Sequence, residues 1–441
     1  MSVKNNPKVK NNPKVKNNQN RETSSNGISA QFNKLMSLLG PGLLWAGAAV
    51  GVSHLVQSTK AGAIYGFSLV GIVLLINIFK YPFFEFGSRY AASTGKTLLE
   101  GYNNLGKWAF YLYLTITFLT MFTIQAVVTL ITSGVVQWFF PNISMPILNT
   151  VILISISILL ALGHYAALDK IIKYVIILLT AMTAVAVIVA IGHYSPERMA
   201  QPTPDLWSKA GIAFMIALMG WMPSPIDLSV WSSIWTTEKQ KENPEASSLK
   251  NTLLDFNIGY IGTTFIALGF LTLGALVMYG SGEPIEAKAG PFAAQLINMY
   301  ASTIGNWSKY LIAFAALATM FSTTITCLDA YGRVLSRSES LIRSGHDNDE
   351  KSYFRWIVIT VAGALLLLGS LKSNMGFMVR LATTLSFLTA PILAILNYKV
   401  VTSKDVPEDA KPPLILKVLS WFGIAFLLIF SGIYFKTMLL S

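Results

Sequence analysis

The sequence predicts an all-α, polytopic membrane protein with about 11 transmembrane helices. The chain has 441 residues, of which 53% are hydrophobic and only 12% are charged. That charged share is about half of what soluble proteins carry. A mean hydropathy of +0.54 excludes a soluble enzyme and a disordered protein. Long unbroken apolar stretches also exclude an outer-membrane barrel, because the strands of such barrels alternate apolar and polar residues.

Eleven apolar spans follow one another along the chain. Each is long enough, or nearly so, to cross about 30 Å of hydrocarbon at about 1.5 Å per residue. The spans are 41–59, 65–87, 108–137, 146–163, 173–192, 209–234, 252–279, 308–334, 356–371, 376–397 and 415–438.

The positions of the basic residues predict the orientation. Most of the 33 Lys and Arg residues fall on one side of the membrane if the amino terminus is cytoplasmic and the spans alternate. The positive-inside rule therefore places the amino terminus in the cytoplasm of a plasma (inner) membrane, and the odd number of spans places the carboxyl terminus outside. The net charge of +12 then reflects topology and contact with the lipid bilayer, and no nucleic-acid partner is expected. We expect a monomer.

The chain divides into four parts. Residues 1–34 repeat the hexapeptide NNPKVK and lack apolar periodicity, which predicts a disordered, basic cytoplasmic tail. Two five-helix repeats are expected at 35–200 and 201–400, followed by a linker and an additional helix 11 at 401–441.

Two spans in matching positions carry helix-breaking residues. The first contains Gly51 and Ser53 near its middle, and the sixth contains Pro223 and Pro225 just after Gly220. Proline removes a backbone donor and clashes with the preceding turn, so the sixth span should unwind locally. Each set of five spans is odd in number, so the two halves must be inverted relative to each other. An inverted 5+5 repeat with broken helices 1 and 6 is typical of the leucine-transporter class, which binds its solute between the breaks.

Short motifs along the chain resemble those of the Nramp family of divalent-metal transporters. The resemblance extends from residue 38 to about 400. Its motifs are Gly40-Pro41-Gly42, Ala61-Gly62-Ala63, Met222-Pro223, Asn251-Thr252-Leu253-Leu254-Asp255 and Ser322-Thr323-Thr324-Ile325-Thr326.

The residues at the centre of the family's metal site are replaced in this chain. The family's Asp-Pro-Gly-Asn motif in helix one corresponds here to Gly51-Val52-Ser53-His54. The family's methionine thioether persists as Met222, and its helix-six carbonyl ligand corresponds to Met219. The third span contains no acidic residue, so proton symport as in the family is not expected.

The resemblance and the breaks together select the candidate site residues. A thioether with an imidazole suits softer metals, whereas a hard divalent ion needs an anionic oxygen. Asp227 is the best replacement carboxylate, and its alternative role is to cap the second half-helix. His54 is a metal ligand, a proton carrier or a neutral hydrogen-bonding residue. The predicted metal ligands are His54, Met222 and Asp227. The predicted substrate-binding residues are Gly51, Ser53, His54, Gln57, Met219, Met222 and Asp227.

Other ionisable residues inside the spans have a structural explanation. Lys80 and Glu85 lie near the cytoplasmic end of the second span, where an interfacial group with Arg89 is expected. Asp329 precedes Arg333 by four residues, a spacing that favours a salt bridge within one helix.

The sequence contains no Walker loop, dinucleotide fingerprint or HExxH motif. We therefore expect no enzyme activity and no cofactor, and transport must be secondary or facilitated. The leading hypothesis is alternating-access transport of a small solute, with a divalent metal ion as substrate. The second hypothesis is transport of a small neutral or zwitterionic, amino-acid-like solute on the same scaffold. The third is a membrane receptor or scaffold that does not transport.

Overall fold

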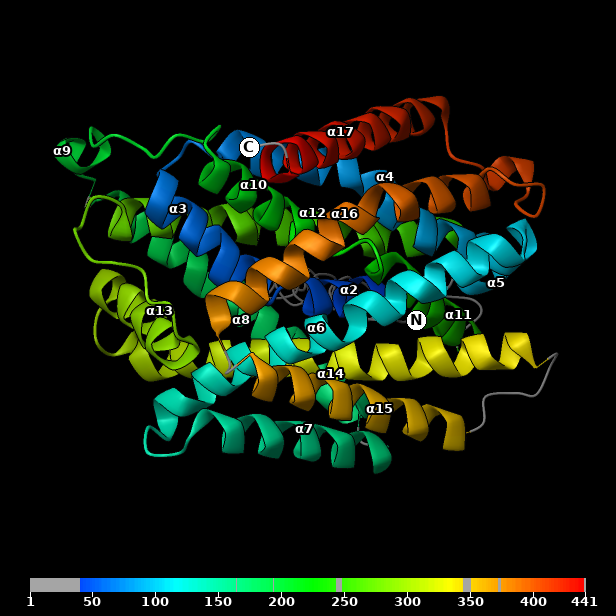
Figure 1. Cartoon of the computed structure of the whole chain (residues 1–441), viewed down its shortest axis with the longest axis horizontal. Coiled ribbons are helices and arrows are strands. Elements are labelled where there is room, and N and C mark those ends of the chain that lie inside the picture. The colour runs from blue at the N-terminus through cyan, green and yellow to red at the C-terminus, as the bar shows by residue number, and fades with distance from the viewer. Residues whose placement is uncertain are drawn as a thin grey trace, which may run out of the picture. The chain divides into compact units, whose positions relative to one another are not determined.

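The computed structural model describes residues 40–163, 165–192, 194–242, 248–343, 350–371 and 374–439, and this part of the chain is helical and contains no strand. The predicted tail, residues 1–34, lies outside the described residues. Figure 1 shows the long helices α7, α12, α14 and α17 running along a common direction. The four-part division of the chain stays a prediction.

Each predicted span corresponds to a helix or a broken helix in the described residues. The first five spans are α2 (Pro41–Ala49) with η1 (Ser53–Ser58) and α3 (Thr59–Tyr65), α4 (Val70–Thr94), α6 (Lys107–Phe139), α7 (Met145–Ala161) and α8 (Tyr165–Ile191). The others are α10 (Lys209–Trp221) with α11 (Leu228–Glu242), α12 (Leu249–Leu273) with η3 (Gly274–Met278), α14 (Ser308–Ile342), α15 (Glu350–Ser370), α16 (Met375–Val401) and α17 (Leu414–Leu439). The connecting helices are α5 (Leu98–Leu105), α9 (Pro196–Met199), α13 (Ala289–Ile304) and η4 (Glu408–Ala410).

Length and apolar composition make these helices suitable for a membrane. In the described part of the chain, seven helices are long and apolar enough to cross it, and three shorter apolar helices lie among them. Several predicted boundaries differ from the structure. The first span continues to Tyr65, α8 begins at Tyr165 rather than at residue 173, and α11 and α14 end at Glu242 and Ile342 rather than at residues 234 and 334. Asp169 and Lys170 belong to the early part of α8, so a search for continuous apolar residues misses its first turns.

The first span is broken where the sequence predicts. The α-helix ends at Ala49 and resumes at Ser53 as a widened, π-helical turn. The backbone N–H groups of His54 and Leu55 both donate to the carbonyl of Gly51, at 3.1 and 2.9 Å. Residues 45–59 are all buried. Irregular backbone at membrane depth is tolerated in such a position, because the protein itself surrounds it.

The sixth span has the wider break. Helix α10 ends at Trp221 and α11 begins at Leu228, so that residues 222–227 are not helical. Pro223 and Pro225 cannot donate backbone hydrogen bonds, which explains why the helix stops here. Both predicted breaks are therefore confirmed.

Close packing against α12 fixes the first half-helix. A Cβ atom at Gly42 would lie 2.2 Å from the carbonyl oxygen of Asp255, and one at Gly259 would lie 2.3 Å from the carbonyl oxygen of Gly42. The Asp255 carboxylate also accepts a hydrogen bond from the backbone N–H of Gly42, at 2.9 Å. An acceptor at a helix N-terminus satisfies a donor that the helix itself leaves free, so Asp255 anchors the start of α2.

Candidate functional site

The two helix breaks touch each other. The hydroxyl of Ser53 lies 3.3 Å from the carbonyl oxygen of Pro223 and 2.9 Å from the carbonyl oxygen of Ala49. One serine at the first break thus connects the end of α2 with the non-helical segment of the sixth span. The two spans that carry helix-breaking residues in the sequence therefore meet in space at their breaks.

His54 bridges the first break to α12. Its Nε2 lies 3.0 Å from the carbonyl oxygen of Thr263, and its Nδ1 lies 2.7 Å from the hydroxyl oxygen of Ser53. A carbonyl only accepts, so Nε2 must carry the proton, and in a neutral ring Nδ1 then accepts from Ser53. Both nitrogens have partners and the ring is fully buried. Binding a metal through His54 would therefore cost one of these hydrogen bonds.

A small cavity lies between the two breaks. Its volume is about 30 Å³, and a cavity must offer about 10–15 Å³ to hold one water molecule. Its polar lining consists of hydroxyl, thiol and indole groups, and no carboxylate belongs to it. The lining residues are Ala48, Ala49, Val52, Ser53, Ile124, Val128, Trp221, Ser224, Pro225, Trp231, Thr323 and Cys327.

The remaining predicted site residues do not line this cavity. Gly51 packs against α14, where a Cβ atom would lie 2.8 Å from the Thr323 hydroxyl oxygen. Gln57 is buried in η1, and Met219 and Met222 are fully buried at the end of α10. Ser53 is thus the one predicted substrate-binding residue on the cavity wall. Among the described residues, no three His, Cys, Asp or Glu side chains lie close enough together to hold a metal ion.

Asp227 lies at the second break, directly before α11, and is buried. Its Oδ1 atom is buried and, within the described part of the chain, has no hydrogen-bond partner. The alternative role as a helix cap would require a backbone N–H donating to this carboxylate, and no such bond is present in that part. A buried carboxylate oxygen without a partner is costly, so this position calls for a functional explanation.

Each half-helix that ends at a break has a polar group at its carboxyl end. The hydroxyl of Thr323, on α14, lies 3.3 and 3.2 Å from the carbonyl oxygens of Gly47 and Val50 at the end of α2. The ammonium of Lys80, on α4, lies at the carboxyl end of α10. It donates to the carbonyl oxygens of Met219 at 2.6 Å and Gly220 at 2.9 Å.

The sequence-based interpretation of Lys80 is wrong. Glu85 and Arg89 form the predicted pair at 2.6 Å, but Lys80 does not join them at an interface. It is fully buried because its face of α4 packs on the sixth span. Sequence reasoning missed this role, since the partner carbonyls come from backbone far along the chain and leave no mark on the local sequence. The carbonyl of Met219, predicted to bind substrate, accepts its hydrogen bond from this lysine.

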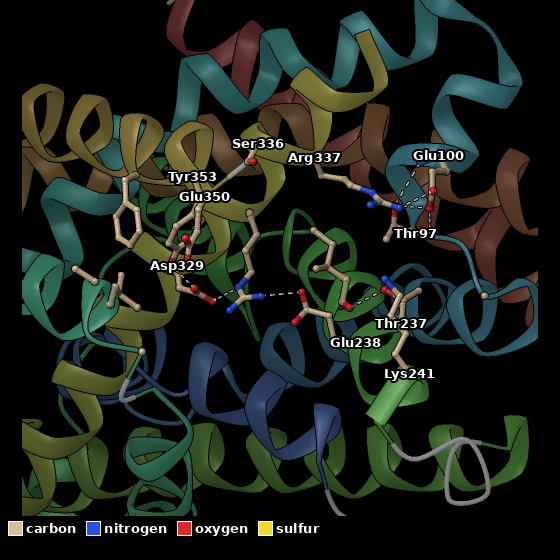
Figure 2. Close-up of a pocket in the computed structure, with 17 residues that line it drawn as sticks. Thr97, Glu100, Thr237, Glu238, Lys241, Asp329, Ser336, Arg337, Glu350 and Tyr353 are labelled. Atoms are coloured by element: carbon tan, nitrogen blue, oxygen red, sulfur yellow. Dashed lines mark hydrogen bonds and ion pairs between the residues drawn. The ribbon is translucent and has the colours of Figure 1, made fainter. Parts of the chain in front are cut away.

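A second, larger cavity opens at the far ends of α11 and α14 (Figure 2). Its volume is about 330 Å³, and ionisable side chains make up much of its wall. Arg333 pairs with Asp329 and with Glu238, each at 2.7 Å, which confirms the predicted bridge within α14. Arg337 pairs with Glu100 at 2.9 Å. We call this space the vestibule; it lies on the side that the basic residues predict to be cytoplasmic.

An aromatic pair joins the two helices that line both the small cavity and the vestibule. Helices α11 and α14 line both spaces, through Trp231 and Cys327 in the cavity and through Glu238 and Arg333 in the vestibule. Between them the rings of Trp231 and Tyr331 meet edge to face, with centroids 5.2 Å apart.

The chain matches one protein-family model and is similar to known proteins. The family model described as natural resistance-associated macrophage protein-like (Nramp) matches residues 42–436. The uncharacterized protein PM0681 of Pasteurella multocida (strain Pm70) is 39% identical, over 90% of this chain and 91% of the relative. The metal transporter NRAT1 of Oryza sativa subsp. japonica is 23% identical, over 92% of this chain and 75% of the relative.

Solved structures share the fold at low sequence identity. A variant of the manganese transporter of Eremococcus coleocola superposes with a TM-score of 0.68 at 13% identity, covering 92% of this chain and 87% of that one. MhsT, solved in complex with L-phenylalanine, gives a TM-score of 0.64 at 14% identity, with 90% and 98% covered. These likenesses confirm the predicted fold class, a polytopic helical membrane protein of the leucine-transporter type with broken helices 1 and 6.

Proposed function

Because this chain belongs to the Nramp family of membrane transporters, we propose that it is a secondary transporter that moves a divalent metal ion by alternating access. The single observation that carries the mechanism is the meeting of the two broken helices beside a small cavity. Broken helices of this kind hold the solute while one helix bundle rocks against the other. Membership of the Nramp family supports a divalent metal ion as the cargo.

The proposed inner path runs from the cavity, past Trp231 and Tyr331, into the vestibule. In the closed arrangement the aromatic pair blocks the passage, and the Arg333–Glu238 ion pair links α14 to α11. Opening would require α11 to move away from α14, which separates both contacts together. We propose that the vestibule is cytoplasmic, with the amino terminus on the same side, the carboxyl terminus outside and a monomeric chain in a plasma (inner) membrane.

Asp227 is the proposed source of negative charge for the metal. Neutral ligands alone leave the charge of a dehydrated ion uncompensated in a low-dielectric site. Asp227 follows the break directly, and its Oδ1 atom is free to take a ligand. Met222 adds a soft thioether at the same break. We keep Ser53 as a cavity-wall contact and give His54 a structural role, because both of its nitrogens are already engaged.

Metal flux into proteoliposomes tests this function. The purified chain, reconstituted into liposomes that enclose a metal-sensitive dye, should take up Mn²⁺ faster than protein-free liposomes do, with a rate that saturates at high Mn²⁺ concentration. Mg²⁺ should be compared in the same preparation, since a harder ion makes stronger demands on anionic oxygen. If neither ion enters faster than into protein-free liposomes, the metal assignment is wrong.

The cavity lining favours a second candidate, transport of a small neutral or zwitterionic organic solute. The wall offers hydroxyls, a thiol and the Trp231 indole, whose N–H has no partner among the described residues. Such groups hydrogen-bond neutral solutes without supplying charge. Stabilisation of the purified chain against heat by amino acids, and not by Mn²⁺, would favour this candidate over the metal.

A further inference from the structure

The carbonyl groups at the second break surround the end of one lysine. The Nζ atom of Lys80 lies 2.6 Å from the Met219 oxygen, 2.9 Å from the Gly220 oxygen and 3.2 Å from the Ser224 oxygen. Two of these carbonyls belong to the last turn of α10, and the third belongs to the non-helical segment. Together they form a cage of three acceptors around a fully buried nitrogen.

This geometry favours the charged form of the lysine. Carbonyl oxygens only accept, so three of them around one nitrogen call for three N–H donors, which an ammonium has and a neutral amine lacks. The carboxyl end of a helix carries a partial negative charge that favours a cation. The end of α10 therefore supplies much of the counter-charge.

No acidic side chain neutralises this ammonium in the part of the chain that the structure describes. The other buried cation of α4, Arg89, pairs with Glu85, and Arg333 of α14 pairs with two acids. Lys80 instead relies on backbone carbonyls alone. In transporters with broken helices, the carboxyl ends of half-helices and the unwound carbonyls beside them are the places where free cations bind.

We propose that Lys80 is a tethered cation that permanently fills the cation position at the carboxyl end of α10. The site then neither binds nor requires a free cation, and the second break keeps its shape without one. The proposal rests on the proposed function only in treating the break as part of a transport site. It also places a fixed positive charge directly behind Ser224, which lines the cavity, so a metal cargo would have to approach from the Asp227 side of the break.

Removing the lysine should create a site for a small ammonium ion. Lys80→Ala deletes three carbons and the ammonium, which n-propylammonium can replace. The thermal unfolding midpoint of Lys80→Ala in detergent should fall by several degrees, because three buried carbonyl oxygens lose their donor. Millimolar propylammonium should restore at least half of that loss. Tetramethylammonium, which is charged but has no N–H, should not.

Lys60→Ala is the matched control. Lys60 also belongs to a broken span, but its ammonium lies over the Phe292 ring at 5.2 Å from the centroid rather than in a carbonyl cage. The proposal is overturned if Lys80→Ala is as stable as wild type or if propylammonium does not stabilise it. It is also overturned if tetramethylammonium stabilises Lys80→Ala as much as propylammonium does, or if propylammonium stabilises Lys60→Ala to the same extent.

Lys80→Gln keeps the test decisive if Lys80→Ala does not accumulate even with propylammonium. Its amide can donate to two of the three carbonyls but carries no charge. An unfolding midpoint below that of wild type supports the tethered cation, and a midpoint equal to wild type overturns it. These readouts need no cargo. If propylammonium rescues Lys80→Ala but the wild-type chain shows no Mn²⁺ flux, only the metal function is rejected. If the wild-type chain transports Mn²⁺ but propylammonium does not rescue Lys80→Ala, only the role of Lys80 is rejected.

Discussion

Replacing Asp227 by asparagine is expected to reduce Mn²⁺ flux at least tenfold without lowering the stability of the fold. The substitution keeps the shape of the side chain and removes its negative charge. A tenfold loss corresponds to about 1.4 kcal/mol of lost ion stabilisation. One charged ligand can readily contribute this much free energy. Because Oδ1 has no partner among the described residues, the protein loses no hydrogen bond there. The thermal unfolding midpoint should stay constant or rise, since burying a neutral amide costs less than burying a carboxylate.

The same substitution at Asp329 provides the control. Asp329 is equally buried, but it bonds to Arg333 at 2.7 Å and accepts from the Tyr353 hydroxyl at 2.6 Å. Asp329→Asn should therefore lower the unfolding midpoint, because removing one member of a partly buried ion pair leaves its partner unsatisfied. Proteoliposome flux and thermal unfolding separate the two cases. A destabilised Asp227→Asn variant with normal flux would show that Asp227 is structural.

Replacing Gly220 by alanine is expected to cause a large loss of stability. Gly220 lies in the last turn of α10, where a Cβ atom would come within 1.9 Å of the backbone carbonyl oxygen of Thr383 on α16. Backbone cannot move aside as a side chain can, so α10 and α16 would have to separate. Overpacking of well-packed interiors costs about 1–3 kcal/mol or more. The break and the Lys80 cage begin at this same turn, so transport should be lost with the packing.

Gly262→Ala tests whether this cost arises from the close contact. Gly262 lies inside α12, and a Cβ atom there would meet nothing within 4 Å. Alanine is favoured over glycine in a helix by about 1 kcal/mol, so Gly262→Ala should leave the unfolding midpoint unchanged or raise it. Equal unfolding midpoints for the two alanine variants would contradict the proposed contact between α10 and α16.

Hydropathy and proline placement predicted most of the fold. Long apolar spans leave few structures other than transmembrane helices, and Pro223 with Pro225 locates the second break to within a few residues. These are local properties of the chain. The starts of the spans were less well predicted where polar residues such as Asp169 occupy the first turns of a helix.

The site could be predicted only in part, because its details depend on contacts between distant segments. The role of His54 depends on the carbonyl of Thr263 in another helix, and that of Lys80 on carbonyls beyond residue 218. The cavity wall includes Thr323 and Cys327 of α14; Thr323 belongs to one of the motifs that resemble the Nramp family, but nothing in the sequence placed it at the cavity. Backbone acceptors have no residue identity, so sequence patterns cannot reveal them.

Labelling of the single cysteine in the chain tests the central claim, that the broken helices enclose a cavity on the transport path. Cys327 is the only cysteine, lines this cavity and is 4% exposed, so a membrane-impermeant thiol reagent reaches it only when the cavity opens. In proteoliposomes that transport Mn²⁺, the account predicts that Cys327 is labelled, that labelling stops flux, and that flux through Cys327→Ser resists the reagent. Sustained flux with Cys327 unlabelled from either side, although it reacts in the unfolded chain, would contradict the account.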